Sequence, residues 1–493
     1  METVTKTSDL AIVGAGLVGS LLSIYMAKRG FNVDIYERRA DMRKETMSAG
    51  RSINLAVSRR GLRALAEVGL ESVVLEHAIP MRGRMIHAVN GELNFQPYGK
   101  DDSEYINSIS RAALNKVLMT EAEKTDLVKI HFNHKCEGMD FERNALKIED
   151  TATNQQLEVL TTIVMSADGA SSAVRDDMMK LPGYRCSEEE LNYGYKELVI
   201  PPGEDGAFLM EKNALHIWPR GTYMLIALPN ADGSYTCTLF LPFEGEPSFA
   251  TLKTPEAVMK FFHEQFADAV PLISDLAATF FSNPTGHMVT VKADRWHYEQ
   301  HALLLGDAAH AIVPFFGQGM NAGFEDLTVL SQCMDSFVNQ GGSLYINRRE
   351  TTQEHQGRRA QEGSTAWTNV FNEFFKLRKH NVDAIADMAV ENFTEMRDKV
   401  ADKRFQLEKA VEKILQRQFP NQYVSRYALV TFSTVPYSFA QEAGLATDEI
   451  LRELCRDIET ADQVDLEKAE KLIAQKLAPM LRDHMAELPV RTR

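Results

Sequence analysis

A glycine-rich turn near the N-terminus has the spacing of a phosphate-binding turn. Gly14-Ala15-Gly16-Leu17-Val18-Gly19 follows an apolar stretch and precedes a helical one. In such a turn the first glycine permits the tight bend, the second lets the backbone approach a pyrophosphate, and the third lets helix and strand pack closely. The unpaired N–H groups at the start of the helix, at Leu17 and Val18, then face the phosphates. Residues 14–19 therefore predict a dinucleotide site.

An acidic residue follows this turn where a dinucleotide site requires one. Glu37 ends the next strand, FNVDIYE, 18 residues after Gly19, and a carboxylate there accepts hydrogen bonds from an adenosine ribose. Arg38 and Arg39 come directly after it and are counted with the cofactor site. The alternative is a surface acid followed by two solvated cations. The motif by itself does not separate NAD from FAD.

Two further acids stand beside glycine where an apolar strand ends. Asp168-Gly169 closes TTIVMSADG, and Gly306-Asp307 closes LLLGD. Open α/β sheets bind ligands at the C-terminal ends of their strands. Each acid alone would be an ordinary turn residue, but the order of the three turns predicts that they lie together around one cofactor.

The segment after Asp307 combines aromatic side chains with bare backbone. Phe315 and Phe316 precede Gly317-Gln318-Gly319-Met320-Asn321, and a helix is expected to begin near Met320. A helix N-terminus stabilises negative charge close to it. The two phenylalanines are expected to line the apolar side of the same site, whereas His310 is interpreted as a structural residue.

The elements that must position these residues fall into three regions. Residues 9–37 predict a strand, helix and strand, and alternating apolar residues between Gly183 and Pro242 predict an antiparallel sheet. Strand character returns at 301–307, so the chain is expected to leave the first domain and come back. We predict an α/β fold with three regions: a Rossmann-like cofactor domain (1–180 and 290–360), an antiparallel-sheet substrate domain (181–289, with strands from around 75–110), and a C-terminal helical region covering the active site (361–493).

Composition excludes several classes of partner. The chain has 493 residues and a net charge of −15, which repels nucleic acid and anionic membrane surfaces. Its five cysteines are scattered and show no metal-ligand spacing, so no metal is expected and a reducing cytoplasm is predicted. We find no signal peptide and no apolar run long enough to span a bilayer. Oligomeric state cannot be inferred.

The three turns together resemble the class A flavoprotein monooxygenases, the single-component aromatic hydroxylases, over residues 8–330. This resemblance implies bound FAD in the Rossmann-like domain and NADPH and O2 as co-substrates. It also implies no separate nicotinamide domain, and the chain has no second GxGxxG motif. Ala56, Arg111 and the pair Met320-Asn321 match FAD contacts of the family.

Four more segments are similar to the branch of this family that hydroxylates kynurenine. They are GRSINLAVSRRG (50–61), MRGRMIH (81–87), QPYGKDDSEYINSISR (96–111) and SRYALVTFS (425–433). With PFFGQGMN they extend the resemblance over nearly the whole chain. They imply 3-hydroxylation of L-kynurenine through a flavin C4a-hydroperoxide.

The resemblance also assigns a substrate site. The substrate carboxylate is expected to be held by Arg84, Tyr98, Asn392 and Tyr427, with Arg84 first because guanidinium binds carboxylate through two parallel hydrogen bonds. The ordinary alternatives are a solvated loop cation, two rings at the edge of the core and a helix asparagine facing water. No acid, base or nucleophile is assigned, because an aniline ring is already activated toward electrophilic oxygen.

Two other functions stay open. One is a class A hydroxylase for a benzoate-type acid, and the other is a non-catalytic dinucleotide-binding redox sensor. The C-terminal hydrophobic membrane anchor of eukaryotic relatives has no counterpart here, so a soluble, bacterial-type member without a membrane anchor is expected.

Overall fold

The computed structural model describes residues 4–44, 54–99, 104–344, 353–395, 402–420 and 422–488, with side chains described in these ranges except in 353–364. Residues 50–53 and 100–103, which belong to two of the segments quoted above, lie outside the described residues. Within the described ranges, no helix combines the length and apolar composition needed to cross a membrane.

A sheet with a parallel centre contains the first strand of the chain. Its order is β17-β18-β11-β1-β2-β8, and β10 and β9 continue from β11 as an antiparallel pair. The strands are β1 (Val4–Val13), β2 (Val33–Tyr36), β8 (Val128–His131), β9 (His134–Asp140), β10 (Ala145–Asp150), β11 (Gln155–Ser166), β17 (His297–Tyr298) and β18 (Ala302–Leu304). The last four residues of β1 are fully buried, which explains their uninterrupted apolar sequence.

Helices connect and cover these strands. α1 (Leu17–Lys28) joins β1 to its parallel neighbour β2, as predicted for residues 9–37. α1 packs against α4 (Arg111–Glu123) and α9 (Gly319–Asn339). β18 pairs parallel with β11, which confirms that the chain returns to this sheet near residue 302.

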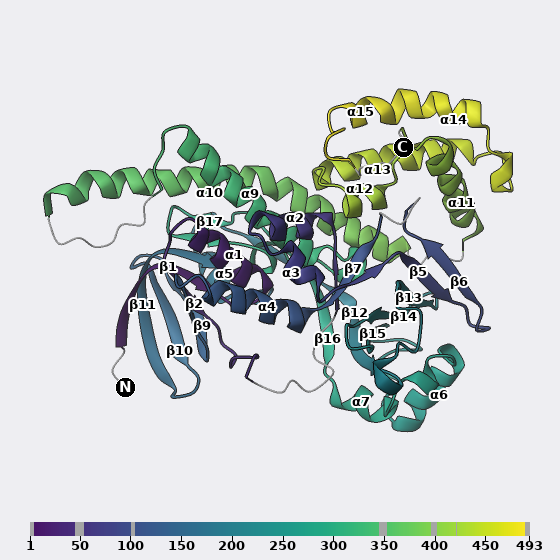
Figure 1. Ribbon diagram of the computed structural model, residues 1–493, viewed down its shortest axis with the longest axis horizontal. Coiled ribbons are helices and arrows are strands. Elements are labelled where there is room, and N and C mark those ends of the chain that lie inside the picture. The colour runs from purple at the N-terminus through teal and green to yellow at the C-terminus, as the bar shows by residue number, and fades with distance from the viewer. Residues whose placement is uncertain are drawn as a thin grey trace.

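A second, seven-stranded sheet has the order β16-β12-β15-β14-β13-β5-β6. Its strands are β5 (Gly83–His87), β6 (Leu93–Pro97), β12 (Cys186–Ile200), β13 (Ala214–Pro219), β14 (Met224–Pro229), β15 (Tyr235–Pro242) and β16 (Thr285–Ala293). All of its pairings are antiparallel except β5 with β13. α6 (Pro255–Gln265) and α7 (Leu276–Ser282) form a hydrophobic core with one of its faces (Figure 1).

A small third sheet has the order β3-β7-β4. Its strands are β3 (Asn54–Val57), β4 (Ile79–Met81) and β7 (Ile106–Ser110). Between β3 and β4 the chain forms α2 (Arg59–Glu67) and α3 (Glu71–Leu75), and β7 leads directly into α4. The Ser110 hydroxyl caps α4 by accepting a hydrogen bond from the backbone N–H of Ala113.

The C-terminal part is helical, as predicted. α10 (Gln353–Thr394) is the long helix that runs along the molecule in Figure 1, and the later helices gather near one of its ends. They are α11 (Lys403–Gln418), α12 (Arg426–Phe432), α13 (Tyr437–Leu454), α14 (Leu466–Leu472) and α15 (Ala478–Arg482). They share a hydrophobic core with part of α10 and with Ala322 of α9.

The predicted α/β class is confirmed. A sheet with parallel strands and an antiparallel sheet alternate along the chain, and helices follow them. The residue borders of the three predicted regions stay predictions.

Candidate cofactor and substrate site

The three turns predicted around one cofactor lie side by side. In the sheet, Val13 at the end of β1 pairs with Ser166 at the end of β11, and Ser166 pairs with Leu304 of β18. All three strands are parallel, so their C-terminal ends meet at one edge. The turns at Gly14, Asp168 and Gly306 follow these ends directly.

Contacts between the turns are close enough to require glycine. A Cβ atom on Gly14, whose φ is +93°, would lie 2.7 Å from the carbonyl oxygen of Ala167, and one on Gly19 would lie 1.9 Å from that of Gly14. A Cβ on Gly306 would lie 3.0 Å from the Val18 side chain. Gly14 and Gly19 therefore serve backbone packing, as the motif predicts.

Gly16 has a different environment, and it fits a bound pyrophosphate. A Cβ on Gly16 would meet no heavy atom within 4 Å. Gly16 also begins α1 without a side-chain hydrogen bond to the helix end. Backbone donors next to open space, at the positive end of a helix, suit the pyrophosphate of FAD.

The acid at the end of β2 lies against the same turn. Glu37 is buried, and its two carboxylate oxygens accept hydrogen bonds from the backbone N–H groups of Ala15 and Arg39, both at 2.9 Å. Each oxygen keeps a lone pair for a ribose hydroxyl. The side chains of Arg38 and Arg39 are exposed. Asn115 of α4, which the sequence analysis missed, donates to the Ala15 carbonyl at 3.1 Å.

The two later acids differ in what surrounds them. Asp168 accepts hydrogen bonds from the Ser166 hydroxyl and from the backbone N–H of Ala173 at 2.9 Å, and burial raises the pKa of its carboxyl. Its side chain thus holds its own turn. Asp307 is exposed while Gly306 and Ala308 on either side are buried, so its carboxylate is accessible to a ligand.

The second predicted helix N-terminus lies beside the third sheet. The Asn321 side chain donates to the carbonyls of Ala56 at 2.8 Å and Gly317 at 3.0 Å, and accepts from the Ser58 backbone at 2.9 Å. Asn321 therefore locks the loop before α9 onto β3, and only its backbone is open to a ligand. Opposite Ala56 on β7 lies Ser108, three residues before the exposed Arg111.

Strand alternation places Arg84 on one face of the seven-stranded sheet. Arg84 pairs with Leu215 of β13, and Leu215 belongs to the hydrophobic cluster that contains Tyr98. His87, three residues further along β5, points to the other face and stacks on Trp218 at 3.9 Å. The face that carries Arg84 is thus separate from the core under α6 and α7.

Arg84 lies beside both predicted tyrosines. Its guanidinium carbon is 5.3 Å from the Tyr98 ring centroid and 4.8 Å from that of Tyr427, and the two rings stack at 5.6 Å. Burial acts to lower the pKa of Arg84, but the hydroxyls of Tyr427 and Tyr98 outweigh it and the net shift is upward. Arg84 forms no ion pair with a carboxylate of the described chain.

The Tyr98 hydroxyl is also short of a partner. It is buried and makes no hydrogen bond of normal geometry within the described residues, although the side chains of Arg84 and Tyr427 lie beside it, and burial raises the pKa of Tyr98 well above its ordinary value. A partly buried cation without a carboxylate, beside a buried hydroxyl, is costly unless an anion completes the group. Both features suit a substrate carboxylate.

The remaining predicted substrate residues adjoin this group. Phe316 stacks on Tyr427 at 6.0 Å, and the Asn392 side chain donates to the Phe315 carbonyl at 2.7 Å. Phe315 also contacts two rings that the sequence analysis missed, Phe393 at 4.3 Å and Phe240 at 5.2 Å. The alternating pattern around Phe240 predicted its strand but did not indicate which face it occupies.

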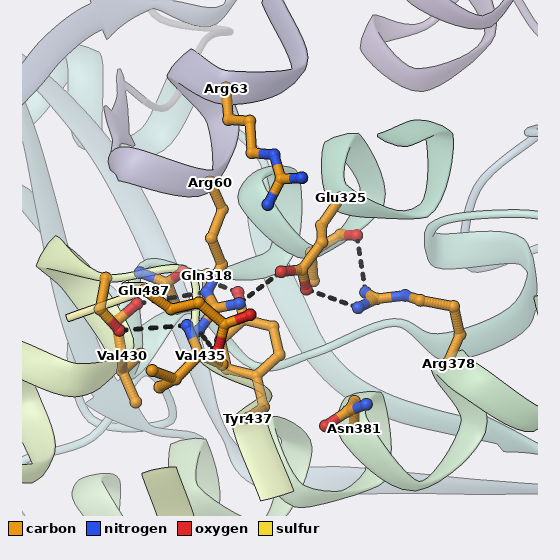
Figure 2. Close-up of polar contacts among 12 residues, drawn as sticks. Arg60, Arg63, Gln318, Glu325, Arg378, Asn381, Val430, Val435, Tyr437 and Glu487 are labelled. Carbon is orange, nitrogen blue, oxygen red and sulfur yellow. Dashed lines mark hydrogen bonds and ion pairs between the residues drawn. The ribbon is translucent and has the colours of Figure 1, made fainter. Parts of the chain in front are cut away.

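His310, interpreted from the sequence as a structural residue, is held inside the protein. Its Nε2 lies 2.7 Å from Asp326 Oδ2, and both side chains are buried. Asp326 belongs to a buried ionic cluster that the sequence analysis also missed. Its other members are Arg60, Glu325 and Arg378, which Figure 2 shows. The adjacent acids Glu325-Asp326 inside an apolar helical stretch were the available signal.

Comparison with known proteins agrees with this geometry. The profile of the family described as "FAD binding domain" matches residues 7–360. A kynurenine 3-monooxygenase from Myxococcus xanthus is 54% identical over 97% of both chains. The kynurenine 3-monooxygenase of Dictyostelium discoideum is 44% identical over 95% of this chain and 98% of its own. That of Xanthomonas campestris is 40% identical over 98% of this chain and 100% of its own.

Solved structures of lower identity share the fold. 2-Methyl-3-hydroxypyridine-5-carboxylic acid oxygenase has a TM-score of 0.59 at 19% identity, covering 83% of this chain and 96% of that one. p-Nitrophenol 4-monooxygenase from Pseudomonas putida has a TM-score of 0.57 at 18% identity, covering 95% and 99%. With its FAD binding domain and this identity to full-length relatives, the chain belongs to the kynurenine 3-monooxygenase family.

Proposed function

We propose that this protein hydroxylates L-kynurenine at carbon 3, with bound FAD as cofactor and with NADPH and O2 as co-substrates. The observation that carries the proposal is Arg84, which lies beside two tyrosine rings without a carboxylate of the described chain to pair with it. The names of the full-length relatives support kynurenine as the substrate.

FAD would be held by the turns at the edge of the parallel sheet. Leu17 and Val18 offer backbone N–H groups to the pyrophosphate, Glu37 accepts from the ribose, and Asp307 accepts from a further hydroxyl. Gly319, Met320 and Asn321 present the start of α9 to the flavin ring, where a helix N-terminus favours negative charge. When bound, FAD supplies the electron transfer from NADPH and the activation of O2.

Arg84 would bind the substrate carboxylate through two parallel hydrogen bonds, with the Tyr98 hydroxyl as a neutral donor beside it. Tyr427 covers the same group from α12. Asn392 donates to the Phe315 carbonyl and so lies beside the same group. We call Arg84, Tyr98, Asn392 and Tyr427 the carboxylate site.

Phe315, Phe316 and the neighbouring Phe240 and Phe393 would surround the aromatic ring of kynurenine and exclude water. With FAD bound, these rings would keep water away from the activated oxygen and would orient the substrate so that the ring carbon next to the amino group faces it. Because the amino group already activates the ring, the proposal requires no general base from the chain.

The experiment is substrate-stimulated oxidation of NADPH by the purified flavoprotein, with product identification. L-Kynurenine should accelerate NADPH oxidation and yield 3-hydroxykynurenine in proportion to the NADPH consumed. Salicylate and 4-hydroxybenzoate serve as controls and should do neither. Stimulation by a benzoate but not by kynurenine would overturn the proposed substrate, and protein purified without flavin would overturn the proposed cofactor.

A further inference from the structure

A fully buried arginine joins the C-terminal helices to the N-terminal half of the chain. Arg60 lies on α2, and its side chain is 0% exposed. Its guanidinium donates to the Val435 carbonyl and, at 3.4 Å through Nε, to the Val430 carbonyl, while Nη1 pairs with Glu325 of α9 (Figure 2). The guanidinium also lies over the Tyr437 ring, 3.8 Å from its centroid. One side chain therefore contacts α9, α12, α13 and the α12–α13 connection.

The cluster continues from Glu325 toward the cofactor turn. Arg378 of α10 pairs with Glu325 and, at 2.9 Å, with Asp326. Asp326 in turn accepts hydrogen bonds from the Gly306 backbone at 3.0 Å and from His310. Gly306 precedes Asp307, so the cluster ends at the third cofactor turn.

A second connection reaches the loop before α9. The Tyr437 hydroxyl donates to the Gln318 side chain at 2.9 Å, and both residues are buried. Gln318 lies between Gly317 and Gly319, directly before α9. The ring that Arg60 covers is thus the ring that fixes this loop.

The same contacts position a residue of the carboxylate site. Tyr427 lies on α12, and Val430, whose carbonyl accepts from Arg60, lies one turn later on that helix. Val435 follows the end of α12, so Arg60 holds the helix and its exit. The Arg84 guanidinium carbon lies 4.8 Å from the Tyr427 ring centroid, and Phe316 stacks on the same ring. Displacing α12 would break both contacts.

The paired charges hold the side chain of Arg60 in a fixed position. Two guanidinium groups and two carboxylates balance within the cluster. Burial acts to raise the pKa of Glu325, but Arg60 and Arg378 outweigh it and hold the pKa below its ordinary value. Removing one member of such a buried set leaves an uncompensated charge. Because these charges hold Arg60 in place, α12, which carries Tyr427, cannot move away without breaking the hydrogen bonds from Arg60 to the Val430 and Val435 carbonyls.

We propose that Arg60 is a positioning residue for the reaction. It fixes α12, and with it Tyr427, relative to the cofactor loop at Gln318, so that the carboxylate site and the flavin environment are assembled as one unit. This inference rests on the proposed function, and it assigns a role in substrate binding to a side chain that lies among protein groups rather than on the substrate.

The test compares Arg60→Met with Arg63→Met. Met retains an unbranched apolar side chain and removes every polar contact of Arg60. Arg63 lies on the same helix, is 44% exposed and pairs only with Glu67 among the described residues, so it is a matched control (Figure 2). Kynurenine affinity is measured by titration, from the change in flavin absorption normalised to FAD-containing protein. Two further measurements are the fraction of NADPH consumed that yields hydroxylated product, and the rate of limited proteolysis of the C-terminal helices.

We expect Arg60→Met to bind kynurenine at least about tenfold more weakly, comparable to the loss of one charged hydrogen bond. Less of the NADPH consumed should appear as hydroxylated product, and the C-terminal helices should be cleaved faster. Arg63→Met should match the wild type in all three. If Arg60→Met yields no folded protein, Arg60→Lys is tested in its place. Lys keeps the charge near Glu325 but lacks the forked guanidinium that reaches the carbonyls of Val430 and Val435, so a smaller loss of kynurenine affinity is expected.

A lower melting temperature with unchanged kynurenine affinity and coupling would show a purely structural role and overturn the inference. Equal affinity in the wild type and in the Arg60 variant tested would overturn it as well. If the wild type itself neither binds nor hydroxylates kynurenine, the proposed function fails. This outcome differs from the one in which the wild type and the Arg60 variant bind kynurenine equally well.

Discussion

At the scale of single residues, the carboxylate site depends on one cation. Arg84 lies beside the rings of Tyr98 and Tyr427, and its position on β5 keeps it away from the core under α6 and α7. Burial keeps the Tyr98 hydroxyl protonated, so it acts as a neutral donor throughout the physiological range. The guanidinium supplies the charge that a carboxylate needs.

Replacing Arg84 by Ala removes a charge-assisted hydrogen-bonding pair. Kynurenine binding should weaken by roughly 1.5 to 3 kcal/mol, or about 10- to 150-fold, while FAD stays bound. A titration followed by flavin absorption measures this. Arg84→Lys keeps the charge without the fork and should recover part of the loss. Unchanged affinity in Arg84→Ala would remove Arg84 from the carboxylate site.

At the scale of elements, the turn between β1 and α1 needs glycine for two different reasons: close packing of the helix at Gly19 and space for a ligand at Gly16. Gly19 lacks room for a Cβ because the carbonyl of Gly14 is too close, whereas Gly16 has open space beside it. An alanine at Gly16 therefore costs the protein alone little, but its methyl group occupies the side from which a pyrophosphate approaches. An alanine at Gly19 forces α1 and the turn apart.

We expect Gly16→Ala to purify with a reduced FAD content and an apoprotein melting temperature equal to that of the wild type. Gly19→Ala should lower the melting temperature of the apoprotein as well. The measurements are the ratio of flavin to protein absorption and thermal unfolding after removal of FAD. Full FAD content in Gly16→Ala would argue against pyrophosphate binding at this turn.

At the scale of the whole molecule, the buried ionic cluster makes stability depend on pH. The pKa of Asp326 lies below its ordinary value because His310 and Arg378 outweigh the effect of burial, and the pKa of Glu325 is lowered in the same way by Arg60 and Arg378. The unfolded chain therefore binds more protons than the folded one in the acidic range. The stabilisation is present above the ordinary carboxyl pKa of about 4 and is lost as the pH falls through the lowered values.

Thermal unfolding should accordingly shift to lower temperature as the pH falls below about 4.5. Glu325→Gln should be less stable than the wild type at neutral pH, because Arg60 and Arg378 lose a shared carboxylate, and it should show a shallower decline toward acid. Melting curves between about pH 3 and 7 test this. Parallel declines in the wild type and the variant would exclude Glu325 as a source of the acid sensitivity.

Most of the cofactor turns were predictable because their chemistry is local. The glycines at 14, 16 and 19 lie within one turn, and Glu37, Asp168 and Asp307 each follow a strand whose apolar pattern is visible in the sequence. Since parallel strands place their C-terminal ends at one edge, local elements were enough to bring these turns together. The group of Arg84, Tyr98, Asn392 and Tyr427 came instead from family resemblance, because its members lie on four separate segments of the chain.

The sequence by itself determined the βαβ unit, the strands that end before Asp168 and Asp307, the alternating strands between Gly183 and Pro242 and the helical C-terminal region, since periodicity and turn residues act over a few positions. Only the tertiary structure decided which face of β5 carries Arg84, because strand register sets it. It also decided that Arg60 meets Glu325 and Val435, which lie 265 and 375 positions away. Such contacts depend on how α2, α9 and α13 pack, and no local pattern encodes the partner of a buried charge.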